Sequence, residues 1–200
     1  MYMRGLSGKK AGGKAMAENL CKCGGKPVYF RRNEKALYCK ACFCRSVEKR
    51  FRKTVGKYGL VKSGDRIAFA LSGGKASSTV LYLMHRMLKP RRDIEVFAIS
   101  IDEGIHSYRT PTLKMAKRLC KMLGVKHHVY SFSSVLGGTL DSKLALSKKD
   151  ACTYCGVGRR YALNMAARKL GATKLCLGHN LDDEAQSVLM NYMRGDLLRA

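Results

Sequence analysis

The chain has 200 residues, of which 46% are hydrophobic, and its 39 Lys and Arg against 14 Asp and Glu give a formal net charge of +25 at pH 7. This length allows one packed domain with a small appendage and excludes two full domains. No apolar run is long enough to span a membrane and no signal segment opens the chain, so we expect a cytoplasmic protein with no membrane partner.

The positive charge is concentrated toward the start of the chain. Residues 1–66 carry 18 Lys and Arg against 4 acidic residues, and the rest carries 21 against 10. Such an excess repels itself in a compact molecule unless a polyanion offsets it. Nucleic acid is therefore the expected partner, and a halo of solubilising lysines is the alternative.

The first two segments differ in composition. Residues 1–18 are rich in Gly and Lys without periodicity, which indicates a disordered tail or an expression remnant. Residues 19–45 contain two cysteine pairs, and nine cysteines in a chain without an export signal favour metal or redox chemistry over disulfides. The spacing predicts a zinc knuckle with four thiolate ligands, Cys21, Cys23, Cys39 and Cys42.

Two questions about the knuckle remain open in the sequence. Zinc ligands are usually separated by at least two residues, whereas the first pair here is C-x-C followed by two glycines. Cys44 is therefore an alternative fourth ligand. We expect the basic side chains around the cysteines to face an RNA backbone. These are Lys22, Lys26, Arg31, Arg32 and Lys40.

A linker helix is expected within residues 46–64, where Val47, Phe51 and Val55 recur at helical spacing. Residues 65–200 then alternate strands with helices. The expected strands lie near 67–71, 96–101, 127–132 and 174–179, and the expected helices near 78–88, 111–123, 156–170 and 182–194. The fold class is therefore α/β, a doubly wound, Rossmann-like parallel sheet with a small zinc-binding domain before it.

Ligands of such sheets bind beyond the carboxyl ends of the strands. ALSGGKASS follows a strand and opens a helix, so its glycines let the backbone pass close to an anion at the helix amino terminus. The loop predicts a pyrophosphate cradle, although it lacks the spacing of kinase and GTPase loops. The turns IDEGI and GHNLDDE are expected at the same edge.

Cys152 and Cys155 form a C-x2-C pair at a helix start, where the helix dipole and the following Arg159 and Arg160 favour thiolates. They are candidate metal ligands or nucleophiles. Cys120 and Cys176 stand alone in apolar surroundings that suit core residues. Asp182 begins the last helix as a candidate cap, and Asp183 is the better functional candidate.

The loop resembles the SGGxDS signature of the PP-loop ATP pyrophosphatases, which cleave ATP between its α and β phosphates. Ala76 stands where that pattern has an aspartate expected to help handle magnesium and phosphate. Either the residue was replaced to trap a complex, which we favour, or the chain is catalytically weakened.

With IDEGI, the segments CTYCGVGRR, GHNLDDEAQ and MNYMRGD resemble tRNA 2-thiouridine synthetases of the TtcA/TtuA family, closest to the cytosolic and archaeal wobble-uridine branch. The resemblance runs from about Cys21 to the end, where that family continues further. It implies an enzyme that adenylates a tRNA uridine at O2 with ATP and Mg²⁺ and then transfers sulfur to C2. It also implies a 4Fe-4S cluster on Cys152, Cys155 and a third cysteine, in addition to Zn²⁺.

The same resemblance implies roles for individual residues. Arg159 neutralises the α-phosphate, and Asp183 holds magnesium or transfers a proton. The nucleotide is expected to contact Ala70, Leu71, Ser72, Gly73, Gly74, Lys75, Ala76, Ser77, Ser100, Ile101, Asp102, Gly178 and Asp183. The expected partners are tRNA, a sulfur donor, which is either sulfide or a thiocarboxylated ubiquitin-like protein, and a second copy in a homodimer.

Three alternatives remain. The Cys152 and Cys155 pair could act as a persulfide or disulfide relay without a cluster. The chain could be an amide- or lysidine-forming PP-loop ligase, which shares the phosphate loop and does not need the cysteine pair. It could also be a zinc-knuckle RNA-binding module with a dead nucleotide fold, which Ala76 and the charge favour.

Overall fold

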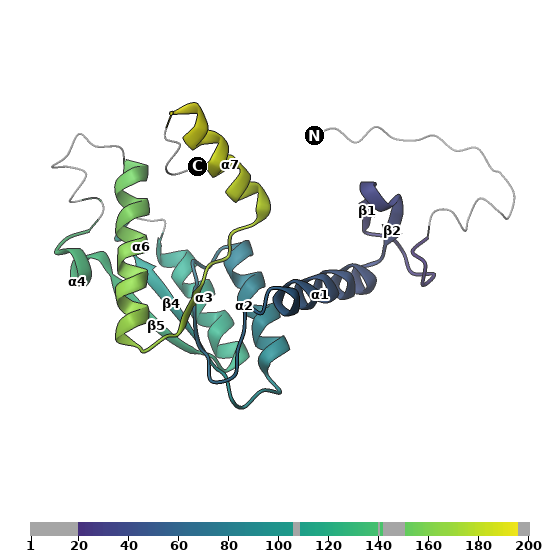
Figure 1. Cartoon of the computed structure of the whole chain (residues 1–200), viewed down its shortest axis with the longest axis horizontal. Coiled ribbons are helices and arrows are strands. Elements are labelled where there is room, and N and C mark those ends of the chain that lie inside the picture. The colour runs from purple at the N-terminus through teal and green to yellow at the C-terminus, as the bar shows by residue number, and fades with distance from the viewer. Residues whose placement is uncertain (1–19, 106–108, 140, 142–150, 196–200) are drawn as a thin grey trace, which may run out of the picture. The chain divides into compact units, whose positions relative to one another are not determined.

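The computed structural model describes residues 20–105, 109–139, 141 and 151–195, with only the backbone of residues 151–153. The expected tail over residues 1–18 lies outside the described residues. The chain divides into two compact units, Met1–Leu60 and Val61–Ala200. Figure 1 shows the elements of both units.

The first unit is a small hairpin followed by one long helix. Strands β1 (Tyr29–Arg31) and β2 (Ala36–Tyr38) pair antiparallel around the short 3-10 helix η2 (Arg32–Glu34). Helix α1 (Lys40–Lys57) begins six residues earlier than expected, because Cys39 has the extended conformation of an N-cap and the second cysteine pair starts the helix.

Arg31 does not face solvent, so its predicted place on an RNA-facing surface is wrong. It is only 8% exposed, and its guanidinium donates to Glu34 at 3.0 Å and to Ser46 at 2.8 Å. It also lies over the ring of Tyr38, 4.6 Å from the ring centroid. A buried guanidinium requires such partners, so Arg31 joins the hairpin to α1. The other four predicted side chains are exposed: Lys22, Lys26, Arg32 and Lys40.

The second unit is a four-stranded parallel sheet with strand order β5-β4-β3-β6. The strands are β3 (Arg66–Ala70), β4 (Glu95–Asp102), β5 (Lys126–Ser131) and β6 (Lys174–Cys176). Three consecutive residues of β3, Ile67 to Phe69, are almost fully buried, as expected of a central parallel strand. The chain adds β4 and β5 on one side of β3 and then crosses to place β6 on the other side. This is the expected doubly wound arrangement.

Helices cover both faces of this sheet. Helices α2 (Lys75–Leu88) and α3 (Arg109–Leu123) pack together on one face, and α4 (Phe132–Leu136) and α6 (Ala151–Lys169) pack together on the other (Figure 1). Alternate β4 residues, among them Phe97 and Ile99, face the α6 side. Small residues of α6, such as Ala162 and Ala166, let the helix lie close against them.

Two local differences from the expected elements have clear causes. The strand expected to reach Phe132 ends at Ser131, because the Ser131 hydroxyl accepts the Ser134 amide at 3.1 Å and caps α4. The strand expected to reach His179 ends at Cys176, and residues 177–180 form a loop to α7 (Leu181–Met193). No residue of α7 is buried, and Leu181 is 83% exposed.

Among the described helices, none combines the length and the apolar character that crossing a membrane requires.

Candidate functional site

A pocket of about 350 Å³ lies where the sheet order reverses between β3 and β6. Its walls come from the loop after β3, the end of β4, and the loop after β6, with contributions from α3 and α6. This is the crevice in which doubly wound sheets bind ligands. Its lining includes Ala70, Leu71, Ser72, Gly74, Lys75, Ala76, Ser77, Ile99, Ile101, Glu103, Arg109, Arg159, Leu163, Leu177, Gly178 and His179.

Two glycines allow the backbone to approach its neighbours closely here. Gly73 has φ of +84°, and a Cβ at this position would lie 2.1 Å from the carbonyl oxygen of Thr112. At Gly178 a Cβ would lie 2.5 Å from the Cα and 2.7 Å from the backbone nitrogen of Ser77. The loop after β6 therefore presses against the first turn of α2, which closes one wall of the pocket.

Hydroxyl groups shape the phosphate loop. The Ser72 and Ser77 hydroxyls lie 2.9 Å apart, and the Ser77 hydroxyl also accepts the Ser72 amide at 3.2 Å. The Gly74 amide donates to the Ser72 hydroxyl at 3.2 Å. Helix α2 starts at Lys75, so the first-turn amides near Ala76 have no partner within the helix and can bind an anion.

A buried carboxylate holds two arginines at the pocket. Glu103 is 3% exposed, its Oε1 lies 2.9 Å from Nε of Arg159, and its Oε2 lies 2.9 Å from Nε of Arg109. Arg109 also donates from Nη1 to the carbonyl oxygen of Ser72 at 2.9 Å. Glu103 Oε2 and Arg109 Nε are close but not aligned for a hydrogen bond, and both atoms are buried, so their interaction is an ion pair shielded from water.

The second hydrogen bond of Arg159 connects the pocket to a thiol. Its Nη2 donates to Sγ of Cys155 at 3.1 Å, and Cys155 lies 8% exposed in the core cluster of the sheet. Cys152 starts the same helix, but its side chain lies outside the described residues.

The two solitary cysteines differ from this pair. Cys120 is 2% exposed in α3, as expected of a core residue, and burial raises the pKa of its thiol to about 11. Cys176 ends the edge strand β6 and is only partly buried as a residue. Burial of its thiol likewise raises its pKa to about 11. At neutral pH neither is a ready thiolate.

Several of the predicted nucleotide contacts do not line the pocket. Ile101 lines the pocket, but the Ser100 hydroxyl points away, donating to the Leu71 carbonyl at 2.6 Å and contacting His127 Nε2 at 2.7 Å. Asp102 accepts the Gly104 amide at 3.0 Å and, like Gly73, does not line the pocket.

Asp183 caps α7. Its Oδ2 accepts the Asn180 amide at 2.9 Å, and the Asn180 side chain accepts the Asp183 amide at 2.9 Å, which is a reciprocal capping box. The capping role expected of Asp182 is therefore wrong, because Asn180 occupies that position. Asp183 is exposed and does not line the pocket.

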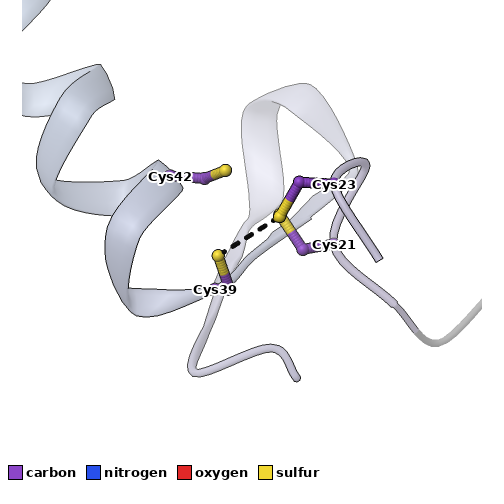
Figure 2. Close-up of side chains that lie close together, drawn as sticks. All are labelled: Cys21, Cys23, Cys39 and Cys42. Carbon is purple, nitrogen blue, oxygen red and sulfur yellow. Dashed lines mark hydrogen bonds between the residues drawn. The ribbon is translucent and has the colours of Figure 1, made fainter. Parts of the chain in front are cut away.

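Four thiols gather in the first unit. The sulfur atoms of Cys21, Cys23, Cys39 and Cys42 all lie within 4.8 Å of one another, and Figure 2 shows their side chains converging. Cys39 is the N-cap of α1 and Cys42 lies in its first turn. Among the described residues Cys44 is exposed and stands outside this group.

Hydrogen bonds from backbone amides lower the pKa of two of these thiols, Cys21 and Cys39. Hydrogen bonding from the backbone of Cys23, followed by that of Cys39, lowers the pKa of Cys21 to about 6. The backbone of Cys42 lowers the pKa of Cys39, whereas the neighbouring thiols, Cys23 first, raise the pKa of Cys42 to about 12. Four converging sulfurs that compete for protons are a donor set that fits one tetrahedral Zn²⁺.

Glu103 and Arg109 were not among the predicted site residues. The IDEGI segment was expected at the pocket edge, but nothing in its letters indicates that Glu103 is buried. Its two partners follow six and 56 positions later, so only the fold reveals the pairing.

Comparisons with known proteins show the family of the chain. The model of the PP-loop domain family matches residues 44–200. A probable sulfurtransferase of Methanocaldococcus jannaschii is 35% identical over 186 residues, which cover 89% of this chain and 54% of the relative. Cytoplasmic tRNA 2-thiolation protein 1 of Saccharomyces cerevisiae is 38% identical over 191 residues, covering 93% and 53%.

A solved structure is also similar. The U34-tRNA thiolase NcsA from Methanococcus maripaludis, solved with its 4Fe-4S cluster, has a TM-score of 0.81 and 35% identity, covering 90% of this chain and 59% of that one. The chain spans about half the length of the curated relatives that it matches.

Proposed function

Because the chain belongs to the PP-loop domain family, we propose that it is the ATP-binding part of an enzyme that thiolates tRNA uridine at C2, at the wobble position. The observation that carries the proposal is the position of Arg159. This side chain lines the pocket next to the phosphate loop and also donates to the sulfur of Cys155 at 3.1 Å. A phosphate-binding pocket and a thiol therefore meet at one guanidinium.

The pocket suits ATP in both charge and shape. Lys75, Arg109 and Arg159 outnumber the single carboxylate of Glu103 in its lining. The amides of the phosphate loop and of the first turn of α2 bind phosphate oxygens. The apolar part of the lining, with Ile99 and Leu163, receives the adenine ring.

The first step is adenylation. Uridine O2 attacks the α-phosphorus of ATP, the bond to the bridging oxygen breaks, and pyrophosphate leaves. Negative charge builds on the α-phosphate as it becomes five-coordinate, and Arg159 with Arg109 offsets it. Because Glu103 fixes both arginines before ATP binds, little reorganisation is needed at the moment of reaction.

The second step is substitution at C2. A sulfide-level sulfur attacks the carbon, the bond to O2 breaks, and AMP leaves with the former O2 as one of its phosphate oxygens. Cys152 and Cys155 would contribute two thiolates to a 4Fe-4S cluster, which when bound holds the sulfur to be transferred. The donor is sulfide or a thiocarboxylated ubiquitin-like protein.

Two metal ions complete the proposal. Zn²⁺ is held by Cys21, Cys23, Cys39 and Cys42, whose converging sulfurs support it. Mg²⁺ is held in part by Asp183, whose capping bond uses Oδ2 and leaves Oδ1 for the ion. A cytoplasmic location and a homodimer, which light scattering would test, are further parts of the proposal.

The test uses Ala76, which lines the pocket in the first turn of α2. Ala76→Asp restores the carboxylate of the family signature, and Ala76→Asn is the uncharged control. Each chain is incubated anaerobically with unmodified tRNA, ATP, Mg²⁺ and sulfide after iron reconstitution, and tRNA nucleosides are analysed by mass spectrometry. We expect Ala76→Asp to raise the yield of 2-thiouridine sharply, and Ala76→Asn to leave it unchanged.

Other outcomes separate the alternatives. Pyrophosphate release without 2-thiouridine, unaffected by Cys155→Ser, would favour the ligase reading. Binding of tRNA without binding of ATP would favour the RNA-binding module. Equal thiolation by the Ala76 chain and by Ala76→Asp would contradict the role given to the carboxylate.

A further inference from the structure

Helix α1 has an apolar side and a basic side. Phe43, Val47, Phe51 and Val55 recur every four residues; Val55 is buried, and the other three are partly buried. Arg45, Lys49 and Lys53 recur at the same interval, two positions later, and all three are exposed. Two positions turn a helix by about 200°, so the two rows lie on opposite sides.

The basic row, here called the α1 stripe, consists of Arg45, Lys49, Arg52 and Lys53. Arg52 lies beside Lys49 because it is three positions further on. The stripe extends about 12 Å along the helix from Arg45 to Lys53. Glu48 is the single acidic residue of α1 against seven basic ones.

The hairpin of the same unit adds exposed aromatic rings. Tyr29 is 45% and Phe30 is 51% exposed, and the ring of Tyr29 packs on Phe43 of α1 with a centroid distance of 4.7 Å. A ring that is half exposed beside a basic helix offers a flat face for stacking. Phosphate contacts and aromatic stacking are two of the means by which proteins bind flexible RNA.

We infer that the α1 stripe is an RNA-binding surface, on which an RNA strand lies with its phosphates against Arg45, Lys49, Arg52 and Lys53. The inference rests on the proposed function for the identity of the RNA, a tRNA. It differs from the surface expected from the sequence, which was built from residues next to the cysteines and included the buried Arg31.

The two other anionic partners fit less well. An anionic membrane binds helices whose apolar side is free to enter the lipid, whereas here Val55 is buried and Phe43 contacts Tyr29. An acidic protein would be recognised by charge alone and would leave the exposed rings without a role. RNA uses both the charge and the rings.

The experiment measures the affinity of the chain for a fluorescein-labelled, unmodified tRNA transcript by anisotropy across a series of salt concentrations, without ATP. The test variant is Arg45→Gln/Lys49→Gln/Lys53→Gln. Glutamine has nearly the helix propensity of lysine and arginine, so the propensity of α1 is kept. Arg45 also donates to the sulfur of Cys42 at 3.4 Å, so the zinc content of each variant is measured as well. Thermal unfolding checks that this variant, and the control variant described next, are folded.

Helix α3 offers a matched control. Lys114, Arg118 and Lys121 are all exposed and recur at i, i+4 and i+7, with the same composition of one Arg and two Lys. Their triple replacement by Gln removes the same charge from the other unit. Any loss that comes from net charge alone appears equally in the two variants.

We expect the α1 variant to bind tRNA at least about tenfold more weakly at 100 mM salt. The negative slope of log K against log salt should become shallower by about two. The α3 variant is expected to change affinity by less than about threefold. Equal losses in the two variants, or no loss in either, would overturn the inference.

Polyglutamate of similar charge tests the protein alternative. If it competes with tRNA at equal charge concentration, and if the α1 variant abolishes that competition, the stripe is a site for acidic proteins and the RNA assignment fails. Failure to thiolate tRNA leaves all these outcomes unaffected, because no step of the measurement requires catalysis.

Discussion

Gly178 is the position at which the loop after β6 contacts the first turn of α2. Its Cα stands so close to Ser77 that even a methyl group would lie 2.5 Å from the Cα of Ser77. The obstacle is backbone at the start of α2, which cannot rotate away as a side chain can. The family resemblance predicted that Gly178 lies against the nucleotide, and the structure shows that it also sets the distance between the loop after β6 and the first turn of α2.

We therefore predict that Gly178→Ala will displace the first turn of α2. The expected result is a loss of about 1–3 kcal/mol in unfolding free energy and a fall of about tenfold or more in ATP affinity. Denaturant titration and isothermal calorimetry measure the two quantities. Gly56→Ala is the control, because its added carbon would meet nothing within 4 Å, and it is expected to add about 0.5–1 kcal/mol.

Individual site residues were predictable where a short motif defines them. Ser72 to Ser77 could be placed because the glycines follow a buried strand and open a helix, a local pattern. Glu103 and Arg109 could not, because their pairing depends on the end of β4 meeting the start of α3. The motif predicted a role for Asp183 at magnesium, but its letters did not show that the same side chain also forms the capping box of α7 with Asn180.

At the scale of elements, Glu103, which follows β4, forms ion pairs with two helices on opposite sides of the pocket. Arg109 belongs to α3 and Arg159 to α6, and these helices cover different faces of the sheet. The side chains of Glu103 and Arg109 are 4% and 7% exposed, whereas that of Arg159 is 47% exposed. The Glu103–Arg109 pair is therefore the buried one, and its disruption leaves a charge without compensation.

We predict that Glu103→Gln will lower the unfolding free energy by about 3 kcal/mol, because the guanidinium of Arg109 stays buried without its anion. Urea denaturation measures the change. The control is Glu95→Gln, which removes an ion pair with Arg66 whose side chains are 42% and 47% exposed, and which should cost less than about 1 kcal/mol. Equal losses would show that burial of the Glu103 pair has no energetic weight.

The elements themselves were largely predictable from periodicity, since hydrophobic spacing separated strands from helices along residues 65–200. The differences lie at the ends. Helix α4 was missed because a five-residue helix is too short to show a period, and only the hydroxyl of Ser131 starts it. Helix α1 was placed too late because its first turn carries Cys42, a residue that the sequence had assigned to a knuckle.

At the scale of the whole molecule, the two units depend on different sources of stability. The described part of the first unit spans residues 20–60, and its buried hydrophobic side chains are Cys21 and Val55. A core of that size does not hold a fold of about 40 residues by itself. The second unit has a continuous core on its sheet and needs no such support.

We predict one zinc ion per chain, lost in Cys39→Ser and kept in Cys44→Ser, as measured by mass spectrometry of the metal. Chelation should abolish the hydrogen-exchange protection of the β1 and β2 amides and leave that of β3 and β4 unchanged, because zinc binding supplies folding free energy to the first unit alone. Retention of zinc by Cys39→Ser, or its loss from Cys44→Ser, would contradict the ligand set.

The strand order β5-β4-β3-β6 also governs the timing of folding during synthesis. β3 can pair with β4 as soon as residue 102 is available, but its other edge waits for β6, and the Arg66 amide bonds Thr173 across 107 positions. At about 5–20 residues per second, the ribosome needs roughly 5–20 s to synthesise the chain between Arg66 and Thr173. Gly178 comes still later, so the nascent chain has no complete nucleotide pocket until its sheet is finished, and ATP cannot assist the earlier stages of folding.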